Sequence, residues 1–76
     1  ASLGNLGLIA KKRGDLAEAE RLYRERLAIM RDISDRQGEA TSLKDLGELM
    51  LETGDIDTGK KLIEFSHLIE RELGFQ

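Results

Sequence analysis

The fold is decided by the sequence Ser-Leu-Lys-Asp-Leu-Gly at residues 42–47, which leads on to Gly-Asp-Ile at residues 54–56. The chain carries nearly the same sequence forty residues earlier, as Ser-Leu-Gly-Asn-Leu-Gly at residues 2–7 and Gly-Asp-Leu at residues 14–16. A fixed period of this size is typical of helical repeat proteins. The two stretches therefore predict two copies of one structural unit.

The repeat extends over almost the whole chain. Residues 1–36 align with residues 41–76 without a gap, and nine of the 36 pairs are identical. The shared positions are mostly apolar residues and glycines, which a fold constrains, whereas most charged positions differ. We expect one domain over residues 1–76, with repeats at 1–36 and 41–76, cut from a longer array. The identical pairs are Ser2/Ser42, Leu3/Leu43, Leu6/Leu46, Gly7/Gly47, Gly14/Gly54, Asp15/Asp55, Leu22/Leu62, Ile29/Ile69 and Arg31/Arg71.

Composition excludes several classes of protein. With 76 residues and no cysteine, the chain has neither disulfides nor thiolate metal sites to support a small core. Its single histidine, His67, does not build a metal site alone, and no nucleophile or phosphate-binding loop accompanies it. No apolar run approaches the roughly 20 residues of a membrane helix. We expect no enzyme activity, no cofactor, no membrane partner and a cytoplasmic location.

Charge differs between the two halves. Residues 1–38 carry 8 Lys/Arg against 6 Asp/Glu, a net charge of +2, and residues 39–76 carry 4 against 9, a net charge of −5. Nucleic-acid binding usually needs a strongly basic face with aromatic stacking groups. The basic half is only mildly basic and its one aromatic residue, Tyr23, occupies a core-type position. We therefore expect no nucleic-acid partner.

Apolar spacing predicts four helices, over residues 1–13, 16–33, about 36–53 and 56–73. Glycine at the identical positions Gly7 and Gly47 costs about 1 kcal/mol relative to alanine inside a helix, which implies close packing there. The expected inward positions are Leu3, Leu6 and Ala10 in the first helix and Ala40, Leu43, Leu46 and Met50 in the third. The expected apolar stripe of the second helix is Leu16, Ala19, Leu22, Tyr23, Leu27, Met30 and Ile33, and the fourth helix carries the apolar residues Ile56, Leu62, Ile63, Phe65, Ile69 and Leu73.

The helix ends carry recognisable signals. Gly14 suits a left-handed C′ residue, and Asp15 is expected to cap the next helix, with Glu18 returning a bond in a capping box. Asp55 repeats this cap, Ser34 or Asp35 caps the third helix, and Gly74 with Phe75 indicates a Schellman stop. No proline separates the repeats, so a fused helix over residues 16–53 is an alternative that would expose apolar faces to another chain.

These residues match a known repeat pattern. The first copy reads Leu3, Leu6-Gly7, Ala10, Ala19, Tyr23, and the second reads Leu43, Leu46-Gly47, Met50, Gly59, Ile63. The chain resembles tetratricopeptide repeats, in particular the variant of about forty residues with an extended second helix. It departs from that pattern in lacking the tryptophan and the final proline, and in carrying Arg26 and Ser66 where the family often has alanine.

The resemblance implies an all-α superhelix, right-handed, of two stacked antiparallel helical hairpins. It also implies a non-catalytic scaffold that holds a peptide or partner helix in a groove lined by the first helix of each repeat. The basic clamp of the chaperone-binding members is not expected, because Gly4, Leu8 and Asp45 stand at its positions. Carried over by position, the expected groove residues are Gly4, Asn5, Leu8, Lys11 and Lys12, then Lys44, Asp45, Glu48, Leu51 and Glu52.

Each groove residue also has a simpler interpretation. Asn5, which would bond a peptide backbone, also suits an exposed helix position. The run from Lys11 to Arg13 either grips an acidic partner or is a solvated helix end favoured by the helix dipole. Carboxylates at Asp45, Glu48 and Glu52 either form an acidic wall or only solvate their helix. His67 replaces Leu27 and is expected at the surface.

Phe65 replaces Glu25 and, with Leu68, places apolar side chains where a terminal helix normally needs polar ones. We expect these two residues to cover a further repeat or a second copy of the chain. Two repeats are marginal alone, which favours self-association, and the charge difference between the halves suits head-to-tail or antiparallel pairing. The alternative function is a sensor segment that binds a signalling peptide and controls an attached output domain, which the full-length gene would reveal.

Overall fold

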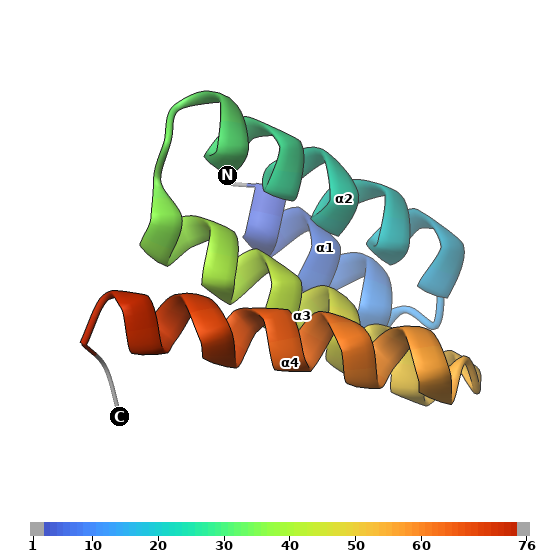
Figure 1. Cartoon of the computed structure of the whole chain (residues 1–76). Helices are drawn as coiled ribbons and strands as arrows, with labels where there is room; N and C mark the ends of the chain where they lie inside the picture. Colours follow the sequence, from blue (N-terminus) through green and yellow to red (C-terminus); the bar gives the residue numbers. More distant parts are fainter. Residues whose placement is uncertain (1–2, 75–76) are drawn as a thin grey trace.

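The computed structural model describes residues 3–74, and within that range Gly4 is described only by its place in a helix. The described residues form four helices and no strand, so the predicted all-α fold is confirmed (Figure 1). The helices are α1 (Leu3–Lys12), α2 (Leu16–Asp32), α3 (Arg36–Thr53) and α4 (Ile56–Glu72).

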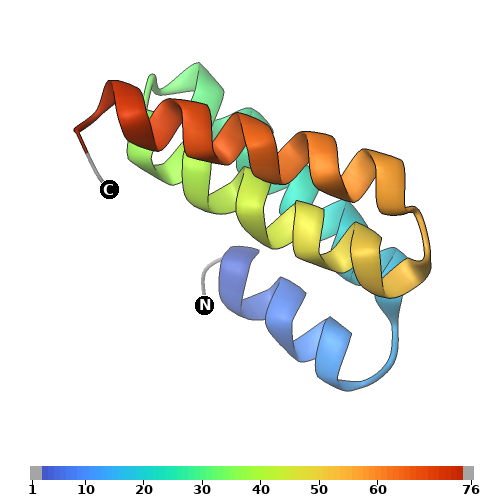
Figure 2. The ribbon, with the colours of Figure 1, turned by 60° about the horizontal axis from the view of Figure 1, so that its bottom comes forward.

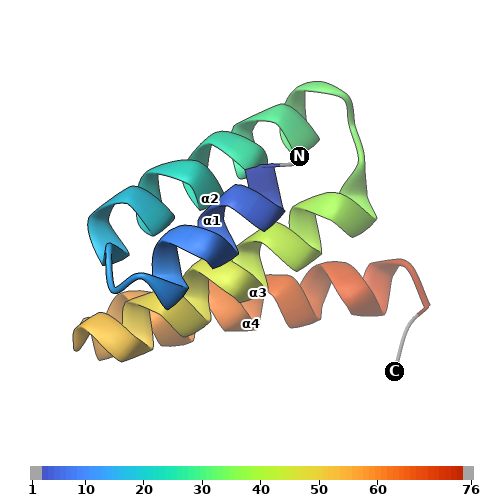
Figure 3. The same ribbon diagram turned by 180° about the vertical axis from the view of Figure 1, so that it is seen from behind.

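The helices form two hairpins that stack on each other. Helix α1 packs on α2, α3 packs on α4, and α2 packs on α3 to join the hairpins. Figure 2 shows α4 at one edge of the stack, with α3 between it and α1. Seen from behind, α1 and α2 again run side by side above α3 and α4 (Figure 3). The predicted stack of two antiparallel hairpins is therefore confirmed.

All three turns between helices are built in the same way. In each turn a residue with a left-handed backbone comes directly before the aspartate that caps the next helix. The left-handed residues are Gly14 (φ 81°), Ser34 (φ 57°) and Gly54 (φ 96°). In each turn the aspartate amide donates to a carbonyl five residues back, at 2.9 Å, and its carboxylate accepts from the amide three residues on. This is a Schellman ending followed directly by an N-cap.

Two expectations about the turns are wrong. The amide of Asp15 donates to the carbonyl of Ala10, and Glu18 binds Arg21, so the capping-box return bond is absent. The return bond does not form because the amide of Asp15 already donates within the Schellman turn. The fused helix over residues 16–53 does not form, because the left-handed Ser34 breaks it and Asp35 caps α3.

The expected left-handed stop at Gly74 is confirmed, with φ 86° and a bond from its amide to the carbonyl of Arg71 at 3.1 Å. Phe75, expected to fold back on this turn, and Ser2 of the repeat lie outside the described residues.

The core follows the apolar stripes most closely in α2 and α3. A side chain at Gly47 would meet the carbonyl oxygen of Gly59 at 2.9 Å, so α3 and α4 approach at backbone distance. A side chain at Gly7 would meet the ring of Tyr23 at 2.7 Å. The packing reason expected for these glycines is thus confirmed. The buried apolar residues are Ala10, Ala19, Leu22, Tyr23, Leu27, Ala40, Leu43, Leu46, Leu49, Met50 and Ile69.

Several residues expected to point inward are exposed. Leu6 is 41% exposed, whereas its repeat partner Leu46 is 0% exposed because α2 covers α3 on that side. Ile33, in the expected apolar stripe, is 62% exposed directly after the end of α2. Three further apolar residues are exposed on α4, at the edge of the stack (Figure 2): Ile56, Phe65 and Leu73.

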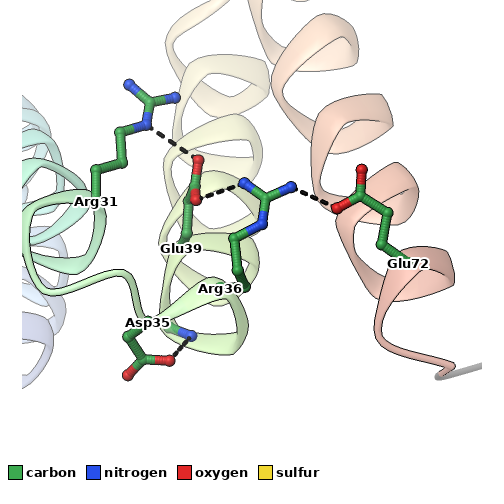
Figure 4. Close-up of polar contacts among 6 residues, drawn as sticks. Arg31, Asp35, Arg36, Glu39 and Glu72 are labelled. Carbon is green, nitrogen blue, oxygen red and sulfur yellow. Dashed lines mark hydrogen bonds and ion pairs between the residues drawn. The ribbon is translucent and has the colours of Figure 1, made fainter.

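Ion pairs join three helices at one end of the molecule (Figure 4). The buried carboxylate of Glu39 accepts from Arg31 of α2 at 3.1 Å and from Arg36 of its own helix at 2.8 Å. Arg36 also donates to Glu72 of α4. A buried charge requires partners, and here two guanidinium groups supply them. The network therefore fixes the ends of α2, α3 and α4 relative to one another.

Replacing Ser34 with glycine should stabilise the fold. Only glycine adopts a left-handed backbone without steric cost, although its greater freedom in the unfolded chain offsets part of the gain. We expect Ser34→Gly to raise the free energy of unfolding by a few tenths to about 1 kcal/mol, measured as a higher urea midpoint at unchanged slope. Gly54→Ala in the equivalent turn should lower it by about 1 kcal/mol. A lower midpoint for Ser34→Gly would contradict this account of the turn.

Glu39→Gln should destabilise the fold by about 1–3 kcal/mol, because Arg31 and Arg36 lose a shared, buried anionic partner. Urea unfolding followed by circular dichroism measures the change. The matched control is Glu25→Gln, whose exposed carboxylate also pairs with an arginine. An exposed pair contributes little, so the control should change stability by less than about 0.5 kcal/mol. Equal effects of the two substitutions would show that the network contributes nothing beyond surface charge.

Candidate partner-binding groove

Two adjoining hollows run along α1 and α3. The first has a volume of about 330 Å³ and lies between α1, α2 and α3. The second has a volume of about 390 Å³ and lies between α3 and α4. Asp45 and Glu48 line both hollows, so the two hollows adjoin, and together they are called the groove. The first is lined by Asn5, Leu8, Lys11, Tyr23, Arg26, Asp45 and Glu48, and the second by Gln37, Ala40, Thr41, Lys44, Asp45, Glu48, Glu70 and Leu73.

The structure brings most of the expected groove residues together. Asn5, Leu8, Lys11, Lys44, Asp45 and Glu48 all line the groove. Lys12 and Glu52 line neither hollow, although both are exposed and Glu52 pairs with Lys11 at 3.1 Å.

Leu51, also expected in the groove, lies against the backbone of Gly59 in α4. Gly4 falls within α1, and its surroundings are not among the described ones. His67 is exposed, as expected.

The second helix of each hairpin contributes walls that the sequence analysis missed. Tyr23 and Arg26 of α2 line the first hollow, and Glu70 and Leu73 of α4 line the second. The positional rule taken from the family names only the first helix of each repeat, so it could not find them. Arg26 could have indicated the α2 wall from sequence alone, because it is a large charged residue where tetratricopeptide-like repeats often have alanine.

Two ion pairs connect the walls of the first hollow. Arg26 of α2 pairs with Asp45 of α3 at 3.4 Å, and Lys11 of α1 pairs with Glu52 of α3 at 3.1 Å. Each pair joins a helix of the first hairpin to α3, so both stabilise the stacking of the hairpins as well as the shape of the groove.

Burial alters the titration of two lining residues. Desolvation raises the pKa of the Asp45 carboxyl above its ordinary value, while the guanidinium of Arg26 opposes the rise. Desolvation likewise raises the pKa of the Tyr23 hydroxyl. The hydrogen bond to Glu52 raises the pKa of the Lys11 ammonium, so that lysine stays charged. Desolvation thus disfavours the ionised forms of Asp45 and Tyr23, whereas the pairing with Glu52 favours the charged form of Lys11.

Among residues 3–74, no group of three or more His, Cys, Asp or Glu residues is arranged to hold a metal ion. None of the described helices is both long and apolar enough to cross a membrane.

A comparison with family models identifies the fold. The model for the tetratricopeptide repeat matches residues 1–58. The chain belongs to the tetratricopeptide repeat family. Tetratricopeptide repeats are non-catalytic repeats that generally mediate protein–protein interactions. The match covers the first hairpin and α3 and ends in the first turn of α4.

No curated protein and no solved structure matches this tetratricopeptide chain. The part of α4 that lies beyond the matched range contains the departures Ser66, in place of a small alanine, and Phe65, in place of the Glu25 of the first copy. The buried hydroxyl of Ser66 donates to Glu70 at 3.1 Å, which accommodates a polar side chain inside the hairpin.

Arg26→Gln should raise the pKa of Asp45 further, because the substitution removes the charge that opposes desolvation. Carbon-13 NMR titration of the carboxyl in both proteins measures this shift. Since the native pKa lies above the unfolded one, the folded state binds the proton more tightly, and stability contributed by this group falls as pH rises from about 3.8 to the native value. This loss of stability with rising pH should be larger in Arg26→Gln than in the wild-type chain. An unchanged pKa in that variant would contradict the pairing of Arg26 with Asp45.

Proposed function

We propose that this chain is a protein–protein interaction scaffold, without catalytic activity, that binds a peptide or a partner helix in the groove along α1 and α3. The observation that supports this most directly is that the two hollows adjoin. Because Asp45 and Glu48 line both hollows, one bound segment can contact both hairpins at once. Contacts with two repeats increase the buried surface and make binding depend on how the hairpins stack.

The composition of the groove suggests the chemistry of the bound segment. Near α1 the lining includes the exposed Leu8, which suits an apolar side chain. Between α3 and α4 the carboxylates of Asp45, Glu48 and Glu70 surround a single lysine, Lys44. We therefore expect the segment to place an apolar residue against Leu8 and a basic residue beside Glu48, since opposite charges favour the bound register.

A second contact, between copies of this chain, is favoured by a separate observation. Phe65 is 59% exposed and Leu68 is 50% exposed, so α4 carries two large apolar side chains in solvent. Neither residue lines the groove, so association through them leaves the groove accessible.

Glu48→Lys should weaken peptide binding about tenfold or more, which corresponds to about 1.4 kcal/mol. The probe is a displayed library of random twelve-residue peptides, selected on the wild-type chain, from which the strongest binders are synthesised and measured by fluorescence anisotropy. Selected peptides should be enriched in lysine or arginine with a neighbouring apolar residue.

The matched control is Glu64→Lys, which makes the same charge change at an exposed position of α4 outside both hollows. Its affinity should stay within about twofold of wild type. If the two substitutions weaken binding equally, the peptides respond to net charge and the groove assignment fails.

A further inference from the structure

Four exposed side chains of α4 form a single stripe. Lys61, Phe65, Leu68 and Glu72 follow the spacing i, i+4, i+7, i+11, and all four are exposed. At about 100° per residue they fall within about 60° of one another around the helix. By the same geometry Leu68 lies about 160° around α4 from Glu70, which lines the groove. The stripe therefore faces away from the groove.

The order of residues along the stripe is complementary to itself. It reads cation, apolar, apolar, anion. Two antiparallel copies related by a two-fold axis midway between Ser66 and His67 set Phe65 against Leu68 of the second copy. The same axis sets Lys61 against Glu72 of the second copy, and each pair occurs twice. A two-fold interface requires this match of one surface with itself.

The equivalent surface of the first repeat lacks the two central apolar residues. The equivalent positions on α2 are Arg21, Glu25, Ala28 and Asp32. There the charge of Arg21 pairs within its own helix, with Glu25 at 3.3 Å and with Glu18. The outer charges have the same signs in both helices, so the difference lies in the centre, where Glu25 and Ala28 become Phe65 and Leu68.

We propose that two copies of this chain associate through antiparallel α4 helices, with Phe65 and Leu68 at the centre and Lys61 paired with Glu72 at each end. This inference rests on the proposed self-association and is independent of peptide binding in the groove. The order of residues along the stripe favours an antiparallel pair over head-to-tail stacking. Only the antiparallel arrangement sets apolar residues against apolar ones and cations against anions.

One of the charged positions already has a partner within the chain. Glu72 accepts from Arg36 through one carboxylate oxygen, while its side chain remains 62% exposed. A carboxylate binds several donors at once, so Lys61 of the second copy adds to this contact without displacing Arg36. The contact thereby extends the ion-pair network of Glu39 to the dimer (Figure 4).

The contact covers three helical turns, which makes a small interface, and small interfaces are weak and transient. We expect a dissociation constant on the order of 100 µM. Sedimentation equilibrium of the 76-residue chain from about 10 µM to about 1 mM spans this range. The wild-type mass should rise toward that of a dimer, and Phe65→Glu, which installs the residue of the first repeat, should remain a monomer.

Reversing the charge of Lys61 or of Glu72 tests whether the two helices pair in the antiparallel register. Lys61→Glu places two glutamates at each end of its dimer, and Glu72→Lys places two lysines there, so each variant alone should dimerise about tenfold or more weakly. An equimolar mixture of the two variants restores opposite charges at both ends. The mixture should therefore associate at least as strongly as wild type.

Arg36→Gln is the matched control for Glu72→Lys, because it breaks the same internal pair and leaves the stripe intact; it should dimerise within about twofold of wild type. Circular dichroism checks that every variant is folded.

A wild-type chain that stays monomeric throughout the range would overturn the proposal. So would a mixture that associates no better than its components, which would indicate a different surface. Phe65→Glu should still bind the selected peptides, so that failure of the dimer and failure of the groove are distinguishable.

Discussion

The arrangement of the whole chain depends on three turns in which a left-handed residue is followed by a capping aspartate. The left-handed residue ends one helix, and the next residue bonds backward through its amide and forward through its carboxylate. Each turn follows the previous one by twenty residues, and Gly74 continues the series. Because the same turn joins helices within a hairpin and between hairpins, the turn recurs twice in each forty-residue sequence repeat. Only Ser34 departs in residue type, and it keeps the left-handed backbone.

The sequence predicted the fold class and the four helices, since apolar periodicity and helix ends are local signals. It was less successful for burial, which depends on neighbours. Leu6 and Leu46 are identical in type and position within the repeat, yet one is 41% exposed and the other 0% exposed. The difference arises because α2 packs on α3, and no helix within residues 3–74 takes the corresponding place on α1. Similarity between repeats does not show which repeat lies at an edge.

The same limit applied to the groove. Positions on the first helix of each repeat were predictable because they follow from a repeat pattern, and six of the ten expected groove residues line the hollows. The walls from α2 and α4 required the angle at which the helices cross. Arg26 shows this best, because its pairing with Asp45 at 3.4 Å joins residues nineteen positions apart on different hairpins. No spacing rule within one repeat contains that contact.

Differences between the two repeats fall on two separate faces. On the groove face, Asn5 becomes Asp45 and Leu8 becomes Glu48, which changes the chemistry offered to a bound segment along its length. On the opposite face of the second helix, Glu25 becomes Phe65, which replaces an internal ion pair with an exposed apolar side chain. The packing positions between these faces vary less in size and charge: Gly7 and Gly47 are identical, and Gly59, which lies against Gly47, replaces the small Ala19. Because the two faces share no residue, they can change independently, and the proposed binding in the groove makes no demand on the residues of the proposed α4 contact.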